Sequence, residues 1–258
     1  MLSPHKWEIA VSAGSYYPDL TQNFPGNDID LYYEDDHLGM QFFAYSCHVD
    51  ELDDPAHVAQ RLYSLQLLLN GALRLNWGDI HAIPVHFSEF ARIDGGGRNY
   101  SVYAKTIEEN PFSENLEIDH FPECNSPRNR YPSHLLNLSK SDSDLRYLLF
   151  LVGLVSKNSP IESILTWGTL YKILDTVRHH VIALQLPFDQ LADRQKINAF
   201  TAACNNMSIL GVYARHGTAG NEPPTRVITD LDEAIDLVIS MAAKFCRAYV
   251  SEPVNKFV

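Results

Sequence analysis

Short stretches of alternating apolar and polar residues recur in the first part of the chain. Trp7–Val11 and Ile29–Tyr33 have this alternation, which is typical of strands with one buried face. Leu38–Val49 is aromatic-rich and follows a turn-like acidic cluster, so it predicts a hairpin with Ile29–Tyr33. Further strands are expected within Ile83–Ile93 and Tyr100–Ile107. The pattern is that of a β-rich domain.

One long helix is predicted among these strands. The stretch Asp53–Pro55 resembles a helix start, because carboxylates and proline are favoured in the first turn. Apolar residues then recur every three or four positions over Val58–Leu73, which predicts a helix that ends near Leu75. A β-rich half with one helix is typical of an α+β domain.

A connector is expected at residues 119–142. Its three prolines, Pro122, Pro127 and Pro132, stand among serines and asparagines that break any hydrophobic period. We therefore predict a β-rich α+β domain over residues 1–118 and a helical bundle domain over residues 143–258.

The second domain is expected to be helical throughout. Four helices are predicted: Asp144–Lys157, Pro160 to about Leu184, Phe188 or Asp193 to Arg215, and Leu231–Tyr249. Ser159 is the expected cap of the second helix, and Thr229 that of the fourth. Four helices with short joints suggest a four-helix bundle, so the fold class is α+β with an all-α C-terminal domain.

The two halves of the chain differ in net charge. Of 258 residues, 32 are Asp or Glu and 20 are Lys or Arg, which gives a net charge of −12. The excess lies in residues 1–140, where 20 acidic residues face 9 basic ones. Such an acidic half repels a phosphate backbone, so we expect any RNA contact to come from the C-terminal domain.

Cellular setting and cofactors are constrained by what the sequence lacks. The four cysteines are far apart, and the N-terminus does not resemble a targeting segment, so a cytoplasmic setting is expected. The longest apolar run, Tyr147–Val155, is too short to cross a membrane. The glycine-rich stretch Asp94–Asn99 lacks the spacing of a phosphate loop and predicts a hairpin turn. We expect no metal site and no cofactor.

The stretch from Asn198 to Ala243 carries the most distinctive residues. It contains Ala-Arg-His-Gly ending at Gly217, and Thr-Asp-Leu-Asp-Glu-Ala beginning at Thr229. With the helix count, these residues resemble the HEPN superfamily of small four-helix bundles found in prokaryotic defence and toxin systems. The resemblance implies a dimer and, as in many members, a metal-independent ribonuclease whose Arg and His are separated by four to six residues.

Arg215 and His216 are the candidate catalytic residues, although they are adjacent and so depart from the HEPN spacing. Arginine matches the geometry of a phosphate, and histidine can move a proton near neutral pH. Arg178 and His179, on the second predicted helix, are candidates to complete an anion-binding site. Alternatively, Arg215 and His216 bind the last carbonyls of the third helix.

Two functional hypotheses follow. In the first, the chain is a binding and assembly protein, with a HEPN-like helical module, an acidic β-rich recognition domain, and a homodimer or protein partner. In the second, it is an atypical metal-independent endoribonuclease that uses the Arg215–His216 region.

Overall fold

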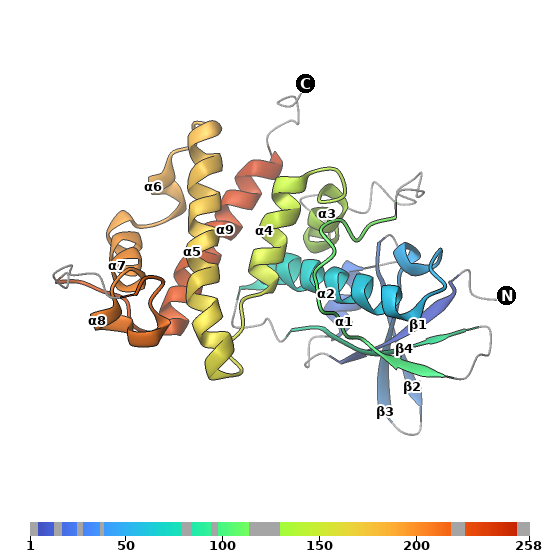
Figure 1. Ribbon diagram of the computed structural model, residues 1–258. Helices are drawn as coiled ribbons and strands as arrows, with labels where there is room; N and C mark the ends of the chain where they lie inside the picture. The colour runs from blue at the N-terminus through green and yellow to red at the C-terminus, as the bar shows by residue number, and fades with distance from the viewer. Residues whose placement is uncertain are drawn as a thin grey trace. The chain divides into compact units, whose positions relative to one another are not determined.

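The protein has an α+β fold, with a five-stranded antiparallel sheet and a long helix followed by a largely helical C-terminal region (Figure 1). The chain forms two compact units, residues 1–72 with 83–146 and residues 73–82 with 147–258. The computed structural model describes residues 5–12, 17–24, 28–36, 39–78, 84–93, 98–113, 130–217 and 225–251.

The sheet of the first unit has the strand order β2-β3-β1-β4-β5, and all neighbours are antiparallel. Its strands are β1 (Trp7–Ser12), β2 (Asp30–Asp36), β3 (Gly39–Tyr45), β4 (His86–Arg92) and β5 (Asn99–Ser101). The predicted hairpin is confirmed, because β2 and β3 pair along their whole length. The expected strand over 100–107 is much shorter than predicted, since β5 ends at Ser101.

Helix α2 (Pro55–Trp77) confirms the predicted long helix. The side chain of Asp54 accepts the N–H of Ala56 at 3.1 Å and so caps its first turn. Within the first unit, α2 also binds the start of β4: the amide group of Asn70 exchanges two hydrogen bonds with the backbone of Val85. Buried apolar residues of the sheet and of α2 form the core of this unit, among them Trp7, Ile9, Leu62, Leu65, Leu69, Phe87 and Phe90.

Two short helices of the first unit were not predicted: α1 (Tyr17–Asn23) and α3 (Tyr131–Leu138). Helix α3 lies in the expected connector and buries Leu135 and Leu136 completely. It begins after Arg130, whose φ of 54° is left-handed, and Pro132 is in its first turn. Residues 114–129, which include the first part of this connector, lie outside the described part.

The second region contains α4 (Ser143–Gly153), α5 (Pro160–Ala183), α6 (Phe188–Leu191), α7 (Arg194–Cys204), α8 (Met207–Leu210) and α9 (Leu231–Ser251). Helix α5 packs against α7 and α9 (Figure 1). The ring of Trp167 on α5 stacks on that of Phe200 on α7, with 6.0 Å between the ring centres. The cap of α5 is confirmed, since Ser159 Oγ accepts the N–H of Glu162 at 3.2 Å.

Two details of the predicted helices are wrong. The expected third helix does not run to Arg215: α7 ends at Cys204, and the side chain of Asn206 accepts the N–H of Ser208 and starts α8. The cap of α9 is Asp230 rather than Thr229, because Asp230 Oδ1 accepts the N–H groups of Asp232 and Glu233 at 2.8 and 3.0 Å.

The end of α2 contributes to the second unit. Arg74 is 7% exposed, and its Nη1 donates to the carbonyl of Val152 at 3.1 Å and to that of Val155. Val152 is in the last turn of α4, where a helix leaves carbonyls without partners inside the helix, and Val155 lies two residues beyond its end. The guanidinium therefore caps α4.

Candidate functional site

Arg215 follows α7 and the 3₁₀ turn η3 (Gly211–Tyr213). Its backbone N–H donates to the carbonyl of Cys204, the last residue of α7, at 2.7 Å. Its guanidinium carbon lies 4.0 Å from the ring centre of Tyr171 on α5, which is cation–π geometry. His216, the next residue, is exposed. The backbone of Arg215, and not its side chain, thus binds the end of α7.

Arg178 and His179 lie further along α5. The guanidinium carbon of Arg178 is 5.9 Å from the ring centre of Phe188, and the ring of His179 meets His180 edge-on at 5.3 Å. Arg178 is seven positions beyond Tyr171, or about 10 Å along the helix axis.

The structure therefore does not bring the four predicted residues into one cluster. No hydrogen bond, ion pair or ring contact among the described residues joins the Arg215–His216 pair to the Arg178–His179 pair. The catalytic and anion-binding roles of these residues stay predictions. In the described part of the chain, no group of three metal-ligating side chains is close enough to hold a metal ion, and no helix could span a membrane.

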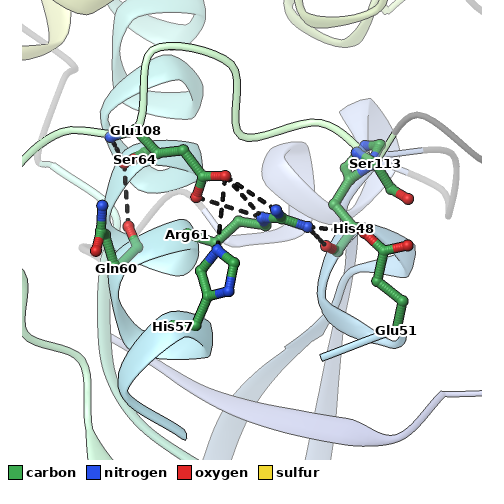
Figure 2. A network of polar contacts seen from close by, with 8 residues as sticks. All are labelled: His48, Glu51, His57, Gln60, Arg61, Ser64, Glu108 and Ser113. Carbon is green, nitrogen blue, oxygen red and sulfur yellow. Dashed lines mark hydrogen bonds and ion pairs between the residues drawn. The ribbon is translucent and has the colours of Figure 1, made fainter. Parts of the chain in front are cut away.

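A polar network in the first unit joins α2 to the segment that follows β5 (Figure 2). Arg61 on α2 is its centre, with a side chain that is only 10% exposed. Its guanidinium donates to both oxygens of Glu108 at 2.9 to 3.3 Å, to Glu51 at 3.0 Å and to the carbonyl of His48 at 2.9 Å. Ser64 Oγ accepts the N–H of Glu108 at 2.9 Å.

These contacts hold irregular backbone in place. The Arg61 guanidinium donates to Glu108, to Glu51 and to the backbone of His48, so it is engaged as a structural anchor. Although burial alone lowers the pKa of Arg61, the contacts to Glu108 and Glu51 raise it above its ordinary value, so the charge is permanent. The network fixes Glu108, in the middle of the segment 102–113, on α2.

His48 and Asp28 form a second buried pair in this unit, 2.9 Å apart. His48 is fully buried, and its Nδ1 accepts the N–H of Ser113 at 3.1 Å, so Nε2 carries the proton and donates to Asp28. Lys140 lies 3.0 Å from the same carboxylate oxygen. Burial raises the pKa of Asp28, but His48 and Lys140 lower it more, and the net pKa is below its ordinary value.

This Asp–His pair is not available as a general base. Both ring nitrogens of His48 are engaged, and no part of the side chain reaches solvent. A general base must have a free nitrogen within reach of the proton that it takes. We therefore assign the pair to structure, since it ties the turn Cys47–Val49 to the start of β2 and, through Lys140, to the end of α3.

The outer face of the sheet carries exposed aromatic side chains rather than buried ion pairs. The register places Tyr32 opposite Phe43, and Phe43 opposite Ala10. The rings of Phe43, Tyr32, Tyr45 and His5 form a stacked row with successive centre distances of 5.5, 4.9 and 5.0 Å. All four side chains are partly exposed. The row is an apolar strip that solvent can reach.

Carboxylates border this strip. Glu8 Oε2 accepts hydrogen bonds from the hydroxyls of Tyr32 and Tyr45, both at 2.9 Å. Burial and the Glu8 contact raise the pKa of Tyr32, so its phenol stays a donor. Asp30, Glu34 and Glu89 also stand at outward positions of the strands. None of the outward strand positions that the structure describes carries a lysine or an arginine.

We call this surface the acidic aromatic face: Glu8, Asp30, Glu34 and Glu89 with Phe43, Tyr32, Tyr45 and His5. The sequence predicted an acidic, β-rich half, but none of these residues was predicted as part of a site. Glu34 was expected in the turn-like acidic cluster, whereas it lies within β2. Alternation along Trp7–Val11 and Ile29–Tyr33 was the available signal, because it places Glu8 and Tyr32 on a polar face. The strand register that brings them together is not visible in either stretch.

Comparison with known proteins assigns no family to this chain. No protein-family model, no curated protein and no solved structure matches it.

Proposed function

We propose that this chain is a binding and assembly protein whose sheet recognises a partner rich in lysine and arginine. The acidic aromatic face carries the proposal, because its outward carboxylates have no lysine or arginine beside them on the described strands. Opposite surface charges steer association and fix its register. The stacked rings can cover the aliphatic stems of lysine and arginine, whose cations are attracted to aromatic faces.

For the helical region, the resemblance to HEPN proteins supports an assembly role as a homodimer. The same resemblance supports a setting in a prokaryotic defence system, and the four widely spaced cysteines support a cytoplasmic one. In this proposal the protein partner binds the sheet, and any RNA contact comes from the less acidic C-terminal region.

The experiment measures binding of a fluorescent nonapeptide in which Arg and Ser alternate. Its reference is the same peptide with citrulline, a neutral analogue of arginine. Fluorescence anisotropy at low salt should show binding of the first peptide only. Glu34→Gln with Glu89→Gln should weaken binding about tenfold, at about 0.5 to 1 kcal/mol for each exposed charge pair.

The matched control is Asp175→Asn with Asp236→Asn, which changes the net charge equally but alters exposed residues of α5 and α9. This control should bind the arginine peptide like the unchanged protein. Equal binding of the arginine and citrulline peptides, or equal weakening by both double variants, would refute recognition by this face.

The ribonuclease hypothesis stays an alternative, because Arg215 and His216 are both exposed and so accessible to RNA. Labelled RNA incubated with the protein in EDTA tests it. Cleavage that disappears in His216→Ala would establish this activity and replace the binding-only proposal. Intact RNA at low salt would remove the alternative.

A further inference from the structure

The helical unit has a pocket of about 370 Å³ where the second half of α5 meets α6 and the first turn of α7. Two arginines line it, Arg178 from α5 and Arg194 from α7. The apolar part of its lining includes Val181, Ile182 and Ile197, and the Ile182 side chain is 78% exposed. Guanidinium groups and exposed aliphatic surface therefore occur together in one concave site.

The charges of the two arginines are not equally available. Arg194 Nε lies 3.2 Å from Asp189 Oδ1, so this arginine is already paired. Arg178 has no ion-pair partner among the described residues, and its guanidinium lies over the ring of Phe188. The pocket thus has one positive charge without a counterion in the described part of the chain.

The N-terminus of α7 does not supply a second anion site. Asp193 Oδ1 already accepts the N–H groups of Gln195 and Lys196, at 2.7 and 3.3 Å. A ligand would have to displace this carboxylate to reach those amides. Arg178 is therefore the main attraction for an anion in this pocket.

We propose that this pocket binds a monoanion with an apolar body: a carboxylate joined to an aliphatic or aromatic group. The carboxylate pairs with the planar fork of Arg178, which matches its geometry. The apolar body covers Ile182 and Val181 and removes their surface from water. A single available positive charge favours a monoanion over a phosphate dianion. This site is independent of the function proposed for the sheet.

The test is a titration of the full chain with 4-phenylbutyrate, followed by the amide signals in ¹H–¹⁵N NMR spectra. Signals of residues 178–198 should shift, with a Kd of about 0.1 to 1 mM, as expected for so small a ligand. Arg178→Gln should weaken binding about tenfold, because it removes a charge-assisted hydrogen bond. The matched control Arg98→Gln, an exposed arginine of the other unit, should leave binding unchanged.

Two analogues test the chemistry of the ligand. The neutral 4-phenylbutyramide should bind at least about tenfold more weakly than the acid, and phenyl phosphate should bind no more tightly than the acid. The proposal is overturned by equal binding of acid and amide, by tighter binding of phenyl phosphate, by unchanged binding in Arg178→Gln, or by no shifts in this segment at about 10 mM ligand.

Discussion

Replacing Arg61 by methionine tests whether its guanidinium anchors residues 102–113 on α2. Methionine keeps an apolar stem in the same place but removes every donor. The change leaves the Glu108 carboxylate, 20% exposed, and the carbonyl of His48 without the donor that they now have. Removing one partner of a buried ion pair costs about 3 to 5 kcal/mol.

The expected loss of unfolding free energy lies at the lower end of this range. Water reaches part of Glu108, and Glu51 is 39% exposed, so its pair with Arg61 contributes little. We expect the free energy of unfolding to fall by about 3 kcal/mol in Arg61→Met. Arg61→Lys should lose about half as much, because an ammonium group cannot bind both oxygens of Glu108 in the same way.

Urea denaturation followed by circular dichroism measures these losses. Hydrogen exchange supplies a local readout, because the N–H of Glu108 is bound to Ser64 and should exchange faster when the segment is released. A double-mutant cycle with Glu108→Gln isolates the pair itself. A loss below about 1 kcal/mol together with unchanged exchange at Glu108 would refute the anchoring role.

Two further predictions concern buried titratable groups. Because the folded pKa of Asp28 is lowered, its contribution to stability is present above the unfolded pKa, near 4, and is lost as pH falls through the folded value. Asp28→Asn should therefore cost about 2 kcal/mol at pH 7, and the two unfolding free energies should converge in acid; a difference that does not shrink as the pH falls below about 4 would contradict this. Burial raises the pKa of Cys204 to about 12, so this thiol should resist a thiol-reactive disulfide reagent at about pH 8 until urea unfolds the chain. Peptide mapping measures its labelling, and labelling of the folded protein as fast as of a free thiol would contradict the expected burial.

The elements that the sequence predicted best are those with a long and regular hydrophobic period. Helix α2 has apolar residues at regular helical spacing, and its observed end, Trp77, is close to the predicted Leu75. Helices α1 and α3 have only 7 and 8 residues, so the period is too short to recognise. The break after α7 does have a local signal, since Asn206 is a favourable cap for a new helix.

The acidic aromatic face, by contrast, could not be predicted from the sequence. Alternation predicts which residues of one strand share a face, but Tyr32 meets Glu8 and Tyr45 across strands that are separated in the chain by 24 and 13 positions. Pairing between strands depends on packing and turn geometry outside each stretch. The row of rings can therefore be recognised only in the assembled sheet, and not in the sequence. Likewise, nothing near Arg178 in the sequence indicated that Arg194 lines the same pocket.

The arginine cap of α4 has an evolutionary consequence. Arg74 stands well before the expected connector in the chain, yet it belongs to the same compact unit as the α4 carbonyls that it binds. Recombination that transferred residues 143–258 alone would leave those carbonyls without their donor. An inherited module that keeps this cap has to include residues 73–82 as well. The helical unit therefore cannot be exchanged as one continuous segment of the gene.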